Sequence, residues 1–218
     1  TMDGTKFLRE NIAAKGQIKN ISDLVEGVDF QISRNTIFHT MSESMRGNPA
    51  SYMDVTHDTN SARFSANLNL RATTKSKVGM DYSESVHGGN MPGMGAVAIS
   101  DDSKFKNTSL FAEVTEQLAG GNKLIAGYRG ESWDVTDKRA GGMMGSTTAG
   151  QTRKEFTSSG FARYESELGS VPNSTAYVGY GRTERMPDYW ELISNKQNSS
   201  GHSALMSTKT EKTNQIDF

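Results

Sequence analysis

Nine short runs of alternating polar and apolar side chains make up most of this chain of 218 residues. The connections between the runs alternate as well. Short connections lie near residues 19–23, 73–75, 119–122 and 169–173, and long ones cover residues 43–60, 87–106, 136–153 and 186–208. A membrane β-barrel turns tightly on one side of the bilayer and has longer loops on the other. The pattern therefore predicts an all-β fold, an antiparallel transmembrane β-barrel.

The alternation is clearest in residues 62–72. One face there is apolar and the other polar, with Phe64, Ala66, Leu68 and Leu70 opposed to Arg63, Ser65, Asn67, Asn69 and Arg71. Neither an amphipathic helix nor a fully buried parallel strand gives a period of two. Each run is long enough to cross a bilayer as a tilted strand.

The composition agrees with a barrel and excludes some other classes. The mean hydropathy is −0.62, and no apolar stretch approaches the roughly 20 residues of a transmembrane helix. A barrel strand exposes only every second side chain to lipid, so a low average is expected. The net charge is −1, and the sequence contains no basic stripe, which argues against a nucleic-acid partner. The absence of cysteine excludes thiolate metal ligands within these residues.

The two ends suggest a part of a larger protein. No signal peptide opens the chain, and its last residues, 209–218, form an apparent strand. Bacterial single-chain barrels normally have an even number of strands, and an unclosed sheet leaves unpaired backbone groups in lipid. We therefore expect further strands outside these residues.

Imidazole and thioether groups gather in the long connections. All four histidines lie in or beside them, as do nine of the eleven methionines; these residues are His39, His57, His87, His202, Met41, Met45, Met53, Met91, Met94, Met143, Met144, Met186 and Met206. Soft sulfur and borderline nitrogen without thiolate suit copper, as Cu(I), better than zinc, calcium or magnesium. The alternative for any one methionine is that it fills irregular loop packing.

His39 and Met41 are the best candidate metal ligands. Val28, Phe30 and Ile32 form an apolar face, so the intervening positions point inward, and counting on by twos reaches both donors. If no bulge intervenes, His39 and Met41 share the lumenal face, roughly 6–7 Å apart at the backbone. The alternative is a hydrated histidine at the membrane rim beside a loop methionine.

Accessory metal capture is expected in the long connections, by Met45, Met53, His87, Met91, Met94, Met143 and Met144. The Gly- and Met-rich residues 88–95 are equally typical of a simple flexible loop. Tyr189 and Trp190 fit an aromatic girdle at the outer interface. Nothing resembles a nucleophile elbow, a P-loop or a zinc-hydrolase helix, so no enzymatic activity is expected.

Two segments resemble the TonB-dependent copper receptors of the outer membrane. The first is FLRENIAAKGQIKNISDLVEGVDFQISRNTIFHTM, residues 7–41, which ends in the pair His39-Thr40-Met41. The second is TERMPDYWELIS, residues 183–194, which is similar to the family's Arg-x-Pro-Asp-Tyr-Trp-Glu-Leu segment. Together they cover about a quarter of the chain, and the segments between them agree in order.

The resemblance implies a location and a mechanism. In that family a barrel of about 22 strands is filled by an N-terminal plug, and copper lies between the barrel's His-x-Met pair and a Cys and a Met of the plug. His39 would supply a nitrogen and Met41 a sulfur, near the extracellular face, while the short turns would be periplasmic. Residues 1–218 would be part of the barrel domain, with the plug and signal peptide outside them. The implied protein is an outer-membrane importer of copper, a monomer surrounded by lipid and energised by the TonB-ExbB-ExbD complex through the plug.

Two other functions remain open at this stage. A TonB-dependent receptor for a siderophore-like metal chelate would use a wide aromatic or cationic pocket instead of bare His and Met donors. A secreted β-rich binding or adhesin module would pack its apolar face against other parts of the protein, away from water, and would fold without detergent.

Overall fold

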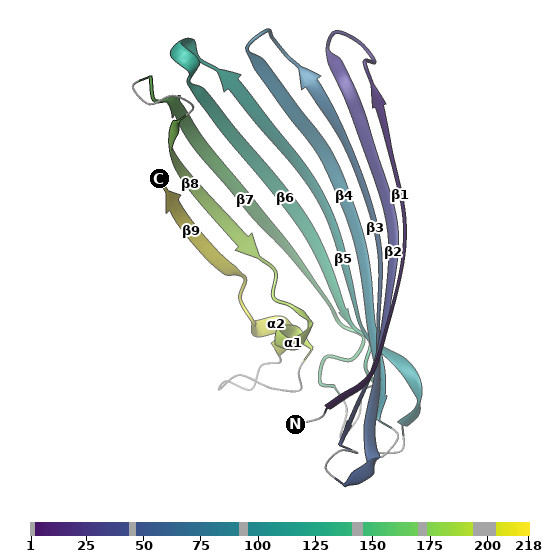
Figure 1. Cartoon of the computed structure of the whole chain (residues 1–218). Coiled ribbons are helices and arrows are strands. Elements are labelled where there is room, and N and C mark those ends of the chain that lie inside the picture. The colour runs from purple at the N-terminus through teal and green to yellow at the C-terminus, as the bar shows by residue number, and fades with distance from the viewer. Residues whose placement is uncertain (1–2, 44–46, 92–95, 141–145, 170–173, 194–203) are drawn as a thin grey trace.

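The chain forms one antiparallel sheet of nine strands, as seen in a computed structural model that describes residues 3–43, 47–91, 96–140, 146–169, 174–193 and 204–218 (Figure 1). The strands are β1 (Asp3–Lys19), β2 (Val25–Glu43), β3 (Asn48–Asn69), β4 (Thr74–Met91), β5 (Ala96–Gln117), β6 (Lys123–Asp137), β7 (Thr152–Glu167), β8 (Thr175–Arg185) and β9 (Glu211–Asp217). Each strand pairs with its neighbours in chain order. The predicted all-β, antiparallel fold with nine strands is confirmed.

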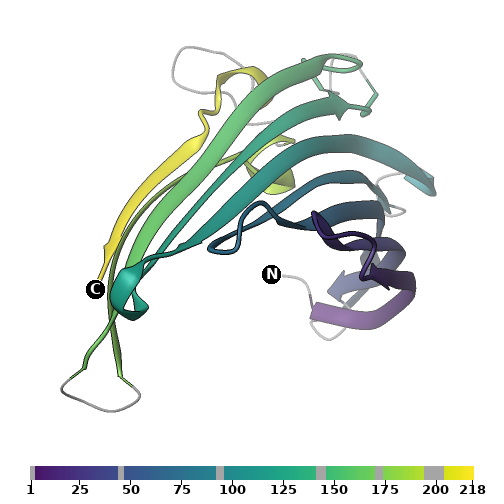
Figure 2. The same cartoon turned by 90° about the horizontal axis from the view of Figure 1, so that it is seen from above.

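The sheet is curved but open. Seen from above, the strands follow an arc with a concave and a convex side (Figure 2). Within the described residues, β1 and β9 pair only with β2 and β8, so both outer edges of the sheet stay unpaired. The described residues therefore do not form a closed barrel, because a closed barrel has no edge.

The convex face carries the large exposed apolar side chains. Phe30, Phe64, Met80 and Leu110 are successive cross-strand partners in β2, β3, β4 and β5, and each is at least 46% exposed. In water such a band would be a large apolar patch, whereas on a barrel it faces the acyl chains. The concave face carries polar partners instead, in the row Gln31, Arg63, Asp81, Ser109 and Glu131.

All short connections lie at one end of the sheet and all long ones at the other (Figure 1). The short turns include the 3-10 turn η3 (Ala119–Gly121), whose Gly120 and Gly121 have positive φ, a conformation that glycine adopts without steric cost. The structure differs from the prediction at the other end. Residues 43–60 and 87–106 are mostly strand, because β2 and β3 extend as one hairpin and β4 and β5 as another.

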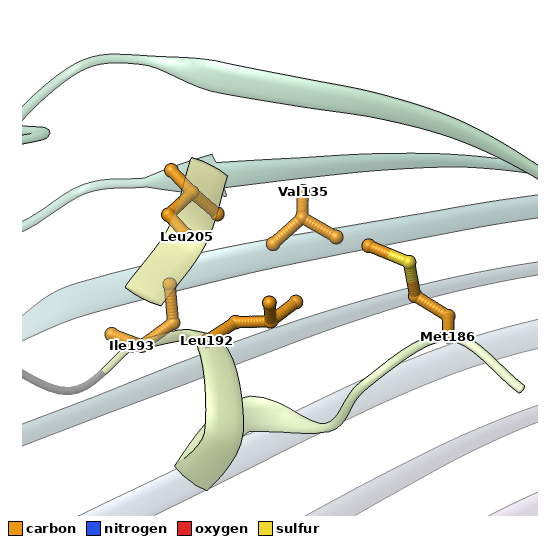
Figure 3. Packing of buried hydrophobic residues seen from close by; sticks show 5 residues of the cluster. All are labelled: Val135, Met186, Leu192, Ile193 and Leu205. Atoms are coloured by element: carbon orange, nitrogen blue, oxygen red, sulfur yellow. The ribbon is translucent and has the colours of Figure 1, made fainter. Parts of the chain in front are cut away.

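Two four-residue helices pack onto the concave face near the long connections. These are α1 (Tyr189–Leu192) and α2 (Ala204–Ser207), between β8 and β9. Asp188 caps α1 through a reciprocal capping box with Glu191. Figure 3 shows the side chains that join these helices to the sheet, namely Val135, Met186, Leu192, Ile193 and Leu205. No helix among the described residues is long and apolar enough to cross a membrane.

Candidate metal-binding site

His39 and Met41 lie on the concave face of β2. The pairing of β2 with β3 is continuous from Gly27 to Ser42, and its irregular positions fall outside that run. Because side chains alternate between the two faces of a strand, His39 and Met41 lie on the same concave face as Gln31. Both side chains are half-buried. The condition of the sequence prediction, that no bulge intervenes, is met.

The structure adds a third soft donor that the sequence prediction had placed among the accessory residues. Met53 in β3 is the direct cross-strand partner of Met41, and Val55 is the partner of His39. Directly opposed residues of an antiparallel pair lie about 5 Å apart on the same face. His39, Met41 and Met53 therefore form one group, which we call the soft-donor cluster. Among the described residues, the His39 imidazole has no hydrogen bond or ion pair with another side chain.

The sequence did not predict that Met53 pairs with Met41, because that pairing depends on the register between β2 and β3. Residues 43–60 were expected to form a loop, and a loop gives no register. Gly47, with a φ of +83°, followed by Asn48 and Pro49, is a turn signal at the centre of this segment. A hairpin turn centred on Gly47 would have placed Met53 opposite Met41, because both are six residues from Gly47.

A second group of side chains lies nearer the short turns than the soft-donor cluster, one inward-facing position along the strands from His39 and Val55. His57 is the partner of Ile37 and of His87, and His87 is in turn the partner of Ser103. All of them share the concave face with the soft-donor cluster. The predicted accessory residue His87 is thus within the sheet and half-buried, instead of on a loop.

The other predicted accessory residues are distributed as follows. Met91 ends β4 and pairs with Ala96. Met45, Met94, Met143 and Met144 lie outside the described residues. The structure therefore brings together His39, Met41 and Met53, and separately His57 and His87, out of the histidines and methionines of the long connections.

Tyr189 is not part of an aromatic girdle, contrary to the sequence prediction. Its ring stacks on His87 with 3.7 Å between ring centroids, and its hydroxyl donates a hydrogen bond of 2.6 Å to Asp102. Burial, with the hydrogen bond to Asp102, raises the pKa of the Tyr189 hydroxyl, which therefore stays a donor. Trp190 is exposed and meets the rings of His87 and Tyr189 edge-on. The helix α1 turns Tyr189 toward the concave face because its apolar residues pack there.

A buried carboxylate anchors the loop after β6. Asp137, the last residue of β6, has no exposed surface and accepts hydrogen bonds from Arg139, Ser146 and Thr148. Arg139 also donates to the carbonyl oxygen of Ile193, just after α1. Burial opposes ionisation of Asp137, but these donors outweigh it, so the pKa of Asp137 lies well below its ordinary value. No sequence motif predicted this network, which holds the residues around α1 over the concave face.

The chain matches one protein family along nearly its whole length. The family is described as "TonB dependent receptor-like, beta-barrel", and the match covers residues 9–218. A search of curated protein sequences found no match.

Solved structures resemble the fold at two levels of identity. "Copper transporter OprC" is 31% identical with a TM-score of 0.87, over 99% of this chain and 36% of that chain. The FrpB iron transporter from Neisseria meningitidis (F5-1 variant) is 13% identical with a TM-score of 0.62, over 82% of this chain and 28% of that one. The apoprotein form of this FrpB variant is also 13% identical, with a TM-score of 0.67, over 95% of this chain and 34% of that one. The FrpB similarity concerns the fold alone. This chain spans about a third of the length of each of these proteins.

Proposed function

Because the chain belongs to the family of TonB-dependent receptor β-barrels, we propose that it is part of an outer-membrane receptor that binds copper on its extracellular side and imports it into the periplasm. Copper is the cargo in this proposal, so no catalytic group is required. The short turns of the sheet would face the periplasm, and the soft-donor cluster would lie toward the outside.

The observation that carries the proposal is the soft-donor cluster itself. One imidazole and two thioethers share one face of a continuously paired hairpin. This donor set is soft, and it favours Cu(I) over the hard cations and over zinc. We propose His39 and Met41 as ligands and Met53 as a third donor from the neighbouring strand.

The similarity to OprC supports copper as the cargo. OprC is a copper transporter, and the 31% identity with it extends over 99% of this chain. A cluster that lies on the lumen wall also needs ligands from inside the lumen to enclose a metal. We propose that an N-terminal plug domain, outside these residues, completes the site and couples it to the TonB-ExbB-ExbD complex, in a monomeric receptor.

The test is the copper content of the full-length protein, purified from outer membranes of cells grown with copper. We expect the His39→Ala, Met41→Ala double variant to lose a stoichiometric amount of copper relative to the parent protein. Heat-modifiable gel mobility, which reports a closed barrel, provides the folding control for both proteins.

Two outcomes would contradict the proposal. An unchanged copper content in the folded double variant would remove His39 and Met41 from the site. An absence of copper from the parent protein would favour a receptor for an organic metal chelate instead.

A further inference from the structure

We propose a second metal site on the lumen wall, in which the imidazoles of His57 and His87 bind oxidised copper, Cu(II). It uses none of the donors of the soft-donor cluster, so either site can exist without the other. We call it the imidazole pair.

The two imidazoles face each other across β3 and β4. His57 and His87 are direct cross-strand partners, with 6.1 Å between their ring centroids and 53° between the ring planes. Imidazoles that share one ion at about 2 Å per nitrogen have ring centres roughly 5–6 Å apart. The backbone therefore already holds the two rings close to the separation that a shared ion requires.

The hydrogen bonds around His87 are those of a metal-binding histidine. Its Nδ1 lies 2.9 and 3.0 Å from the two carboxylate oxygens of Asp102, and Tyr189 donates to that carboxylate while stacking on the ring. A carboxylate that accepts the Nδ1 proton fixes the tautomer in which Nε2 has a free lone pair. Histidines that bind metals almost always have such a partner. Asp102 thus orients the His87 ligand without being a ligand itself.

His57 is held in a similar way by a hydroxyl group. Its Nε2 lies 2.6 Å from the Oγ of Ser85, and Nδ1 has no hydrogen bond to a described residue. In the tautomer in which the Nε2–H of His57 donates to Ser85, Nδ1 keeps its lone pair, and this is the tautomer that the site requires. Among the described residues, no group of three or more His, Cys, Asp or Glu side chains could hold a metal ion. The remaining ligands of the imidazole pair would be water or groups from the rest of the protein.

Buried polar atoms without partners lie in the same place. The two histidines line a recess of about 460 Å³ together with Ser103, Trp133 and Met186. The Oγ of Ser103, which is fully buried and lies opposite His87, has no hydrogen-bond partner among the described residues, and neither does the Nε1 of Trp133. Buried polar atoms of proteins are rarely unpaired, and such atoms often mark an ordered water or an ion. A hydrated cation on the imidazole pair would provide water for both.

The chemistry of the donors identifies the ion. The imidazole pair offers nitrogen without thiolate, which suits borderline divalent metals, and Cu(II) binds most strongly in that series. The soft-donor cluster instead favours Cu(I). The lumen wall would thus have one site for each oxidation state of copper, with the Cu(II) site one position nearer the periplasmic end.

The experiment uses the full-length His39→Ala, Met41→Ala variant, so that copper on the soft-donor cluster does not contribute. We expect this protein to bind added CuCl₂ stoichiometrically, with an electron paramagnetic resonance spectrum that shows nitrogen ligands. Adding His57→Gln and His87→Gln should abolish both the stoichiometric Cu(II) binding and the spectrum of nitrogen ligands. The two proteins are compared only where both keep heat-modifiable mobility.

A third variant tests the orientation of His87 while both imidazoles remain. Asp102→Asn in the same background should weaken Cu(II) binding about 10- to 100-fold, the usual effect of losing such a partner. The site is refuted by an absence of bound Cu(II) in the His39→Ala, Met41→Ala protein, or by Cu(II) binding that persists after His57→Gln and His87→Gln are added. Unchanged affinity in the Asp102 variant would refute the proposed geometry. None of these results bears on copper that is lost with His39 and Met41.

Discussion

At the scale of single residues, Asp137 illustrates how this chain keeps a charge away from water. Its carboxylate is fully buried, and the donors on Arg139, Ser146 and Thr148 replace the lost hydration. Hydrogen bonds to a charged group contribute more than those between neutral groups, about 1.5–3 kcal/mol each in net terms. The fold of the loop after β6 therefore depends on one ionised side chain.

Acid should loosen this loop before it affects the strands. The pKa of Asp137 is lower in the folded protein than its ordinary value of 3.8, so its stabilising contribution is complete above that value. The contribution is lost as the pH falls below about 4 toward the folded pKa. We expect faster hydrogen exchange of the Gly150 and Gln151 amides, which are hydrogen-bonded within this loop, after correction for intrinsic rates. Asp137→Asn should show this exchange already at pH 7, with little further change in acid. Protection that stays constant in the parent protein down to pH 3 would contradict the expectation.

Met53 permits a sharper test of the soft-donor cluster than removal of His39. Met53→Leu preserves volume and apolar character but removes the sulfur, so packing should be retained. We expect Cu(I) affinity to fall roughly tenfold, which corresponds to about 1.4 kcal/mol. Met80→Leu is the matched control, because Met80 lies exposed on the convex face. Competition with a Cu(I) chelator measures both variants, and equal affinities would exclude Met53 as a donor.

At the scale of the strands, the sequence predicts the part of the sheet that lies in lipid and misses the part beyond it. A membrane crossing needs roughly 9–11 residues of tilted strand, whereas β3 and β5 each have 22 residues. Outside the bilayer neither face must be apolar, so the period of two fades while the backbone pairing continues. This is why residues 43–60 and 87–106 looked like loops. The alternation that reached His39 and Met41 started in the lipid-facing part of β2, and so their face was predictable.

The two faces of the sheet should respond differently to an added charge. Leu110→Arg places a cation among the lipid-facing side chains of β5 and should destabilise the barrel by about 2–4 kcal/mol. Gln17→Arg on the concave face of β1, opposite Asp29, should leave stability within about 0.5 kcal/mol. Urea unfolding of the full-length protein in lipid vesicles measures both. A similar loss of stability for the two variants would mean that the convex face is not the lipid face.

At the scale of the whole molecule, the helices α1 and α2 show what the sequence could not supply. The segment of residues 183–194 was recognisable, but its packing depends on Val135, which lies about fifty residues earlier in the chain and on another strand. Contacts of this kind follow from the curvature of the sheet, which brings the concave face toward the helices (Figure 2). No local pattern contains that information. The cross-strand pairing of His57 with His87 is non-local in the same way.

The open edges of the sheet lead to a prediction about the isolated segment. β1 and β9 each present one side whose backbone groups have no strand partner among the described residues, and each unpaired group in hydrocarbon costs several kcal/mol. Residues 1–218 produced alone should therefore form no heat-modifiable species in detergent, whereas the full-length protein should. Exposed strand edges and the apolar convex face should also make the segment aggregate in detergent-free buffer. Size-exclusion chromatography and circular dichroism of the segment test this directly. A folded, soluble monomer without detergent would mean that the convex face is buried against protein, as in a secreted β-rich module, and that would contradict the assignment of this face to lipid.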